Sequence, residues 1–515
     1  MSEYLRRPTT QRVTEDAQVT PLELFFDLVF VYALTQTTAL MASNVSVEGL
    51  ARGFVVLALV WWCWVGYSWL GNQAQADEGI VRVAFIVVMM AMFVLALTIP
   101  ETWGDLPGGL EAPVVFALCY LVIRVAHLGL YWIAAAGDTG LRRTLRLFAA
   151  TALGSSAVLL AGASWPEQWR LPLWTVALAV DLGGTIAIGA SGWRINAPGH
   201  FAERHGLIII VALGESIVAI GVGVTSLPIS MPVIVASALG IAVSGALWWI
   251  YFDTASLLAE HRLADADDVD QVALGRDAFS YLHLPMVLGV VILSVGLKRT
   301  LSYAGGEEDH QWTDSITGLG GATVPLGVAV FLAGHLASRA RCRLSLPPGD
   351  VAGIVVLVAL AVGGPHVPAF LTLAAAVAVL TVLVVVELWR DSGRALRDPP
   401  CLNAETGQVS GPVVRTCSTC SSARRSSSSQ SWECCPTRRT HQPRASLRER
   451  ATPASTSVSS TCRSVWRKRV MTGAANDVKT LRSSPNSTPH ATLRPVACSS
   501  SLAISIRRER VSSRN

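Results

Sequence analysis

Residues 20–36 read Thr-Pro-Leu-Glu-Leu-Phe-Phe-Asp-Leu-Val-Phe-Val-Tyr-Ala-Leu-Thr-Gln and open a long apolar run. The run nevertheless contains two carboxylates, Glu23 and Asp27, which are four residues apart. Residues at this spacing lie on the same face of an α-helix. Two carboxylates on one face of a membrane-length helix are costly unless other groups pair with them. The segment therefore predicts a polar site buried inside a membrane protein.

The composition is that of a membrane protein. The chain has 515 residues, of which 51% are hydrophobic and only 15% are charged, and its mean hydropathy is +0.45. Soluble domains carry about 25% charged residues. Residues 1–19 are polar and contain no short apolar core, so we expect no cleavable signal peptide. The sequence thus predicts an all-α polytopic membrane protein, with residues 1–21 as a cytoplasmic segment and 22–390 as the transmembrane domain.

Twelve apolar stretches are long enough to cross about 30 Å of hydrocarbon. Turn signals built on proline and glycine separate most of them. We expect about twelve transmembrane helices at residues 22–42, 50–70, 81–99, 113–136, 145–163, 171–192, 205–226, 231–252, 279–300, 318–338, 350–365 and 368–389.

The orientation follows from the arginines, which are in excess on the cytoplasmic side of membrane proteins. With the N-terminus inside, the connections alternate between arginine-rich and arginine-poor, and the loop at 100–112 has acidic residues but no Lys or Arg. This pattern predicts that both ends of the transmembrane domain face the cytoplasm. The arginines expected on that side include Arg6, Arg7, Arg12, Arg142, Arg143, Arg146, Arg194, Arg204, Arg262, Arg276, Arg339, Arg341, Arg343, Arg390 and Arg394.

The two halves of the domain, 22–192 and 205–390, resemble each other weakly. Phe30-Val-Tyr-Ala-Leu-Thr-Gln36 in the first span is similar to Ile209-Ile-Val-Ala-Leu-Gly-Glu215 in the seventh, and a His-Leu pair recurs in the fourth and tenth. Six spans per half would give two parallel repeats, an arrangement in which transporters place their site at the repeat interface. The alternative is that helices rich in Ala, Val and Leu match by composition alone.

The end of the chain, assigned here to residues 391–515, differs in composition from the transmembrane domain. Residues 401–515 hold 19 Lys and Arg but only 5 Asp and Glu, and are rich in Ser and Thr. Such a segment has little apolar surface to bury and is expected to be disordered. Its abrupt start also fits a frame-shifted reading of the coding region, so we assign it no function. The sequence indicates no nucleic-acid partner, no metal site and no cofactor. The one partner that its composition implies is the lipid bilayer.

Several ionisable residues fall well inside the expected spans: Asp27, Arg124, His127, Asp181 and Glu215. Such groups usually face a bundle interior or an aqueous cavity. Arg124 and His127 are three residues apart and share a helix face, and a guanidinium forms strong pairs with carboxylates. Arg124 is therefore expected to pair with Asp27, Asp181 or Glu215. The alternative is a static ion pair that fixes the packing of the helices.

Two further positions carry specific expectations. Gly214 precedes Glu215 and would let another helix approach closely, so that Glu215 could bind a cation or carry a proton. Its alternative is a neutral carboxyl hydrogen-bonded to a neighbouring helix. His283 precedes Pro285, which frees a carbonyl near Tyr281, and the two groups could line a site.

Five motifs occur in order along the chain: Pro21-Leu-Glu-Leu-Phe-Phe-Asp-Leu-Val-Phe, Arg124-Val-Ala-His127-Leu, Glu203-Arg-His-Gly-Leu to Gly214-Glu-Ser-Ile-Val, Trp248-Trp-Ile-Tyr-Phe-Asp253 and Tyr281-Leu-His-Leu-Pro. Their order resembles that of the bacterial low temperature requirement protein A (LtrA) family over about residues 15–390. The resemblance implies a multi-pass inner-membrane protein of bacteria but no particular activity or cofactor. It marks the following positions as parts of family motifs without giving them a role: Glu23, Asp27, Glu203, Gly214, Glu215, Asp253 and His283.

Three functions remain open from sequence. The first is a secondary transporter or proton- or ion-coupled carrier of a small solute, with Asp27, Arg124 and Glu215 as its central site and His127 and Asp181 nearby. The second is an intramembrane enzyme acting on a lipid or isoprenoid through His127, His283 and His335. The third is a non-catalytic membrane component required for growth in the cold. We assign no catalytic residue.

Overall fold

The computed structural model describes residues 13–14, 17–77, 79–104, 107–225, 227–306 and 310–397, and for 391–397 it describes the backbone only. Most of the segment at 1–21, and nearly all of the tail at 391–515, lie outside the described residues. The predictions for these two segments are therefore left as predictions.

The twelve predicted membrane helices are confirmed: the described residues form twelve helices that are long and apolar enough to cross a membrane, and they form no β-strand. The first half contains α1 (Pro21–Ser43), α2 (Val47–Gly71), α3 (Gly79–Thr98), α4 (Ala112–Ala134), α5 (Thr139–Ser164) and α6 (Glu167–Ile188). The second half contains α7 (Pro198–Val224), α8 (Met231–Phe252), the short α9 (Ala255–Ala264) and α10 (Asp268–Leu274), a π-helical turn η2 (Gly275–Tyr281), α11 (His283–Gly305), α12 (Thr323–Arg341), α13 (Pro348–Gly363) and α14 (Ala369–Arg397).

Local sequence explains where the two helices that matter most begin. Thr20 caps α1 and forms a capping box with Glu23, while Pro21 occupies the first turn. The seventh helix was predicted to begin at 205 but begins at Pro198, because proline at the first helical position starts a helix rather than ending one. Arg204, which was predicted to lie in a cytoplasmic connection, is therefore inside α7.

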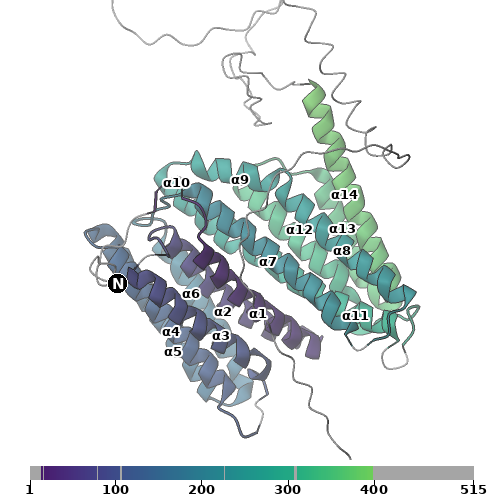
Figure 1. Ribbon diagram of the computed structural model, residues 1–515, viewed down its shortest axis with the longest axis horizontal. Helices are drawn as coiled ribbons and strands as arrows, with labels where there is room; N and C mark the ends of the chain where they lie inside the picture. Colours follow the sequence, from purple (N-terminus) through teal and green to yellow (C-terminus); the bar gives the residue numbers. More distant parts are fainter. Residues whose placement is uncertain are drawn as a thin grey trace, which may run out of the picture. The chain divides into compact units, whose positions relative to one another are not determined.

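The helices of each half meet in the same order. In the first half α1 contacts α2 and α3, α3 contacts α4, α4 contacts α5, α5 contacts α6, and α2 contacts α6. In the second half α7 contacts α8 and α11, α11 contacts α12, α12 contacts α13, α13 contacts α14, and α8 contacts α14. Figure 1 shows α1 and α7 side by side between the other helices of the two halves, and the two helices are in contact.

A Tyr–His ring pair lies at the corresponding place in each half. Tyr67 of α2 lies 5.6 Å from His127 of α4, between ring centroids, and Tyr251 of α8 lies 6.2 Å from His335 of α12 at a similar tilt. Both pairs join the second and fourth long helices of their half. The neighbour order and these ring pairs favour the two-repeat interpretation over a chance match in composition.

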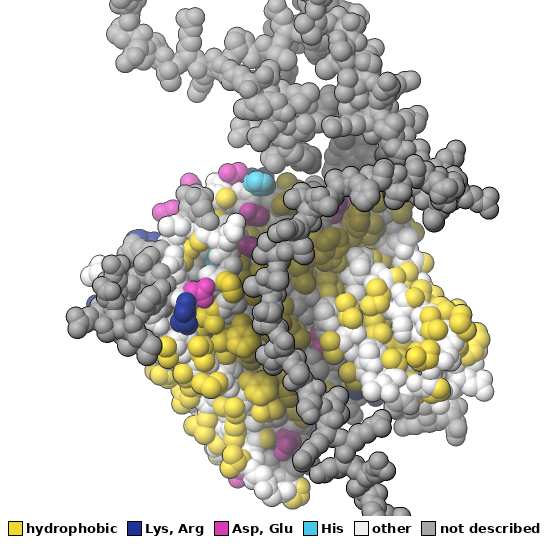
Figure 2. Space-filling model, viewed as in Figure 1, with side chains coloured by type: hydrophobic (Ala, Val, Ile, Leu, Met, Phe, Trp, Pro, Cys, Tyr) yellow, Lys and Arg dark blue, Asp and Glu magenta, His cyan; other side chains and the backbone are white. Residues whose placement is uncertain are grey.

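The outer surface is apolar where lipid would be expected. Along α13, Val351, Val355, Val358 and Val362 are all exposed at helical spacing. Figure 2 shows hydrophobic side chains spread across the middle of the viewed face, with acidic and histidine side chains gathered at its upper margin, over α9 and α10. Exposed apolar stripes of this extent are stable in a bilayer rather than in water.

Candidate functional site

The two halves meet at a group of buried polar side chains that we call the interface cluster: Glu23 and Asp27 of α1, Trp64 of α2, and His200 and Arg204 of α7. Arg204 bridges the two carboxylates, with Nη1 2.8 Å from Glu23 Oε1 and Nη2 3.0 Å from Asp27 Oδ1. The His200 imidazole lies 3.1 Å from the second oxygen of Glu23. Trp64 donates its indole N–H to Asp27 Oδ1 at 2.8 Å. Each of the four ionisable side chains is at most 3% exposed.

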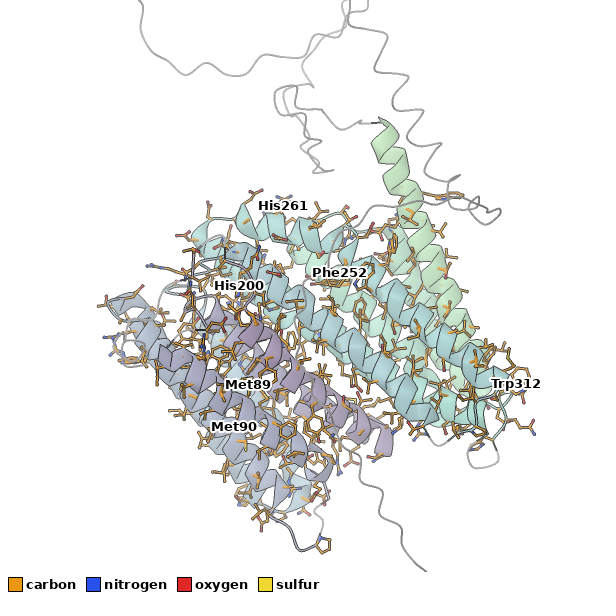
Figure 3. The ribbon with its side chains drawn as sticks, viewed as in Figure 1. Met89, Met90, His200, Phe252, His261 and Trp312 are labelled. Carbon is orange, nitrogen blue, oxygen red and sulfur yellow. The ribbon has the colours of Figure 1, made fainter. Side chains whose placement is uncertain are left out.

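The spacing of the cluster follows from helix geometry. Glu23 and Asp27 are one turn apart on α1, and so are their partners His200 and Arg204 on α7. Residues four apart lie one above the other, so two parallel helices can match two acidic groups to two basic ones. Figure 3 labels His200 where the first turns of α1 and α7 lie together. The cluster thus ties the start of one half to the start of the other.

Asn72, just after α2, holds the entry of α7 in place. Its side-chain oxygen accepts the backbone N–H of Asn196 at 2.7 Å, and its amide donates to the carbonyl of Ala197 at 2.7 Å. Gly71 gives the cluster its room, because a Cβ at this position would come within 2.3 Å of Glu23 Oε1. The end of α2 thus positions the start of α7 and leaves room for the Glu23 carboxylate of α1.

The interface cluster holds two carboxylates and one permanent positive charge, the Arg204 guanidinium. Two carboxylates share one guanidinium, and the nearest further basic group is the His200 imidazole. Asp27 Oδ2 and Arg204 Nε are buried and have no hydrogen-bond partner. Two carboxylates beside one guanidinium leave a net negative charge unless a proton or a cation is also bound, and a net charge in an apolar surrounding is costly. A proton or a small cation taken up by the cluster would remove that cost.

Glu215 lies on the same seam between α1 and α7, but further along it. Thr35 of α1 donates its hydroxyl to Glu215 Oε2. Eleven residues separate Glu215 from Arg204, roughly 16 Å along a helix. The prediction that Gly214 admits a close neighbouring helix is wrong, because a Cβ added there would meet nothing within 4 Å. Glu215 is thus held by a hydroxyl group of α1 and not by close packing at Gly214.

Arg124 belongs to a different group, buried inside the first half. Its Nη2 lies 2.7 Å from Asp181 Oδ1, and Tyr120 donates its hydroxyl to Asp181 Oδ2 at 2.5 Å. Of the three carboxylates considered from sequence, Arg124 therefore pairs with Asp181. It does not join Asp27 and Glu215, because α4 packs against α2, α3 and α5 whereas those two carboxylates lie between α1 and α7. His127 lines a cavity next to this pair.

The remaining motif positions are spread over the fold. His283 accepts a hydrogen bond from the Tyr251 hydroxyl at 2.8 Å, and its Nδ1–H donates to the carbonyl of Ala278 in the π-helical turn at 3.0 Å. The sequence predicted that His283 and a free carbonyl near Tyr281 could line a site. In the structure His283 is instead hydrogen-bonded to the carbonyl of Ala278. Glu203 and Asp253 are exposed.

Histidines 127, 283 and 335 are not gathered into one centre. His127 is in the first half, and the other two are in the second half, where both rings lie near the ring of Tyr251. Among the described residues, no group of three His, Cys, Asp or Glu side chains is placed to hold a metal ion.

Sequence reasoning missed both basic members of the interface cluster. Arg204 was counted as a loop residue and His200 was not considered. A usable signal existed, since a His and an Arg one turn apart follow a helix-starting proline, just as Glu23 and Asp27 do. The two acidic residues and the two basic residues could have been matched from sequence only if the seventh helix had been predicted to begin at Pro198.

The helices, their apolar surface and their buried charges define the chain as an α-helical multi-pass membrane protein. Residues 18–385 match the family described as bacterial low temperature requirement A protein (LtrA), and the chain belongs to that family. A protein of Rhizobium meliloti (strain 1021), described as uncharacterized, is 28% identical over 388 residues, which cover 73% of this chain and 90% of the relative. No solved structure matches the chain.

Proposed function

We propose that this protein is a proton- or cation-coupled carrier whose coupling site is the interface cluster. The observation that supports this most is the charge imbalance: Glu23 and Asp27 from one half share the single guanidinium of Arg204 from the other half, with all three side chains buried. A static ion pair that served only to fix packing would be expected to balance. An unbalanced group is linked to the uptake and release of a positive charge.

In this mechanism Asp27 is the group that is loaded. Its Oδ1 accepts from Trp64 and Arg204, while Oδ2 has no partner and is free to take a proton or contact a cation. Loading removes the net negative charge and weakens the hold of Arg204 on Asp27. The two halves can then change their relative arrangement, so the loaded and unloaded states differ in the free energy of the interface.

Polar groups at two levels of the contact between α1 and α7 support a route for the ion along these helices. The interface cluster lies within two turns of the ends at which both helices begin, and Glu215 with Thr35 lies further along the same seam. Polar groups at two levels of one helix interface would let an ion pass from one to the other. We therefore retain Asp27 and Glu215 from the site predicted from sequence, and we assign to Arg204 the role predicted for Arg124.

We further propose that the protein lies in the bacterial inner membrane with both ends of the domain in the cytoplasm. Arg204 is buried and no longer counts toward orientation, but Arg143 and Arg146 are exposed at the start of α5. By the alternation of spans, they lie at the same end of the bundle as the start of α1. The excess of arginine at that end supports its assignment to the cytoplasm.

The test is ion flux into liposomes that contain the purified full-length chain, measured after a pH jump and in Na⁺ and K⁺ gradients. Asp27→Asn should abolish the flux while the amount of folded protein stays the same. The matched control is Glu203→Gln, which neutralises an exposed carboxylate next to Arg204 and should leave the flux unchanged. Flux that persists unaltered in Asp27→Asn, or that is absent from well-folded wild-type protein, contradicts the proposal.

A further inference from the structure

A pocket lies in the second half where α12 and α14 end and α13 begins, and we call it the α13–α14 pocket. Its volume is about 250 Å³, which exceeds the roughly 150 Å³ of a protein cavity that holds benzene. Its walls come from α12, α13, α14, the start of α9 and the connection between α12 and α13. These three long helices pack against one another (Figure 1). By the alternation of spans, the pocket is at the end of the bundle where α1 and α7 begin.

Charges of both signs line the α13–α14 pocket: Arg339, Asp350, Glu387 and Arg390. Arg339 is 6% exposed and donates from Nε and Nη2 to the carbonyl of Ser345, at 3.1 and 2.9 Å. Its Nη1 lies 3.9 Å from Glu387 Oε1. Two guanidinium groups and two carboxylates balance, so the pocket favours a ligand without net charge.

Asp350 and Arg390 are the charges of this pocket that remain available to a ligand. In the described part of the chain, neither side chain forms an ion pair or a hydrogen bond, although both line the pocket. They are nevertheless close enough for the charge of Arg390 to act on Asp350. A guanidinium binds phosphate well, and a carboxylate accepts hydrogen bonds from an ammonium group. Opposite charges held apart across one space therefore suit a ligand that carries both an ammonium and a phosphate.

Apolar surface adjoins the pocket on the side that faces lipid. Leu346 lines the pocket and is 48% exposed, and the exposed stripe of α13 begins at Val351, one residue after Asp350. On α14, Val382 and Trp389 are exposed as well. An exposed tryptophan near the end of a span is typical of the boundary between hydrocarbon and water. A polar pocket bordered by apolar helix faces has the pattern of an amphiphile.

We propose that the α13–α14 pocket binds the headgroup of a phospholipid with a primary ammonium, of which phosphatidylethanolamine is the simplest representative. The phosphate pairs with Arg390, the ammonium donates to Asp350, and the acyl chains lie along the apolar faces of α13 and α14. Quaternary ammonium groups are held by aromatic side chains, and none of the described aromatic residues lines this pocket. The proposal does not rest on the carrier function, because no residue of the pocket belongs to the interface cluster.

Native mass spectrometry of the full-length protein in detergent tests the chemistry of the headgroup. Phosphatidylethanolamine, phosphatidylcholine and phosphatidylglycerol with the same acyl chains are added in turn. Phosphatidylethanolamine should bind at least about tenfold more tightly than the other two, because only its headgroup donates to Asp350. Equal binding of phosphatidylcholine overturns the primary ammonium, and tighter binding of phosphatidylglycerol overturns the zwitterion. If none of the three binds, the proposal fails.

Free phosphoethanolamine separates a membrane source of the ligand from a soluble one. It has the same ammonium and phosphate but no acyl chains, so it loses the apolar contacts along α13 and α14. At the same concentration it should not displace bound phosphatidylethanolamine. Displacement of the lipid would show that a soluble zwitterion is the ligand, and would overturn the assignment to phospholipid.

Two matched substitutions test the location. Asp350→Asn keeps the size of the side chain but removes its charge, and should lower phosphatidylethanolamine affinity about tenfold and abolish the preference over phosphatidylcholine. Asp268→Asn is the control, because Asp268 is also an acidic residue in the first turn of a helix but does not line the pocket. Equal losses in the two variants overturn the assignment.

A second variant covers the case in which Asp350→Asn does not fold. Gly349→Leu narrows the pocket from α13 and leaves both charges in place. Its Cβ is expected to fit, because the nearest atom, of Leu383, would be 3.7 Å away. The variant should bind phosphatidylethanolamine about tenfold more weakly, while the Asp268→Asn protein binds as wild type. Unaltered binding by a folded Gly349→Leu protein places the lipid elsewhere and overturns the proposal.

Discussion

Two buried arginines of this protein differ in the number of carboxylates that they contact. Arg124 is 1% exposed and meets one carboxylate, Asp181, within the first half. Arg204 is 0% exposed and meets two carboxylates, Glu23 and Asp27, across the junction of the halves. The balanced pair suits a fixed support between α4 and α6. Under the proposed function, a positive charge enters and leaves at the group with two carboxylates and one guanidinium. The number of charged partners, and not burial alone, then distinguishes the two sites.

The largest effect is expected from Arg204→Gln. Removing the guanidinium leaves two buried carboxylates without a cation, and breaking a buried pair in this way destabilises proteins by about 3–5 kcal/mol. We expect loss of most of the folded protein, measured as a monodisperse peak in detergent and as the midpoint of thermal unfolding. The triple variant with Glu23→Gln and Asp27→Asn should recover folding, since no buried charge is left unpaired. A triple variant no more stable than Arg204→Gln would show that packing, and not charge, governs this junction.

A smaller but still large effect is expected for the balanced pair. Arg124→Gln and Asp181→Asn should each lower the free energy of unfolding by about 3 kcal/mol, whereas the double variant should recover most of this loss. Thermal unfolding of the wild type, the two single variants and the double variant gives the coupling free energy between Arg124 and Asp181. The double variant should also retain wild-type ion flux. Flux lost in a stable double variant would move the coupling role from Arg204 to Arg124.

Next in size is a comparison of two glycines on either side of the junction. Gly71→Ala should destabilise the protein by about 1–3 kcal/mol, because the new Cβ would press against Glu23. Gly214→Ala should be neutral or stabilising by up to about 1 kcal/mol, because its Cβ meets open space and alanine is the better helix former. Thermal unfolding of both variants distinguishes them, and equal losses would contradict the geometry of the cluster.

The smallest effect on stability is expected at Glu215. Glu215→Gln keeps an oxygen that accepts from Thr35, so the free energy of unfolding should change by less than about 1 kcal/mol. Its flux should nevertheless lose its dependence on pH if the seam carries the ion. Thr35→Val serves as the matched partner, because it removes the hydroxyl but leaves the carboxyl in place. Normal pH dependence in Glu215→Gln would confine the site to the interface cluster.

Most of the architecture could be predicted from the chain alone. The apolar runs located all twelve membrane helices within a few residues at most ends, because the length of a span is set by the thickness of the bilayer. Two starts differ more: α5 begins at Thr139 and not at 145, and α7 begins at Pro198 and not at 205. In the second case Pro198-Gly199 was interpreted as a turn, although proline also begins helices. That error of about two helical turns placed Arg204 in a connection instead of inside α7.

The buried acidic groups were equally predictable, but their partners were not. Asp27, Asp181 and Glu215 stood out because carboxylates are rare in apolar helices. Which cation meets which carboxylate depends on the helices that lie side by side, and the one-dimensional pattern leaves this open. Arg124 had three possible partners in the sequence and one in the structure, because its side chain reaches Asp181 of α6 whereas Asp27 and Glu215 lie between α1 and α7.

The sequence by itself determined that this is a helical membrane protein with carboxylates at depth, since the bilayer imposes the length and polarity of its spans. Only the tertiary structure decided that Glu23 and Asp27 share Arg204 while Asp181 has Arg124 to itself. Helix positions in the sequence are local properties, whereas the pairing of charges depends on contacts between residues 177 positions apart. Such contacts exist only once the two halves have packed together.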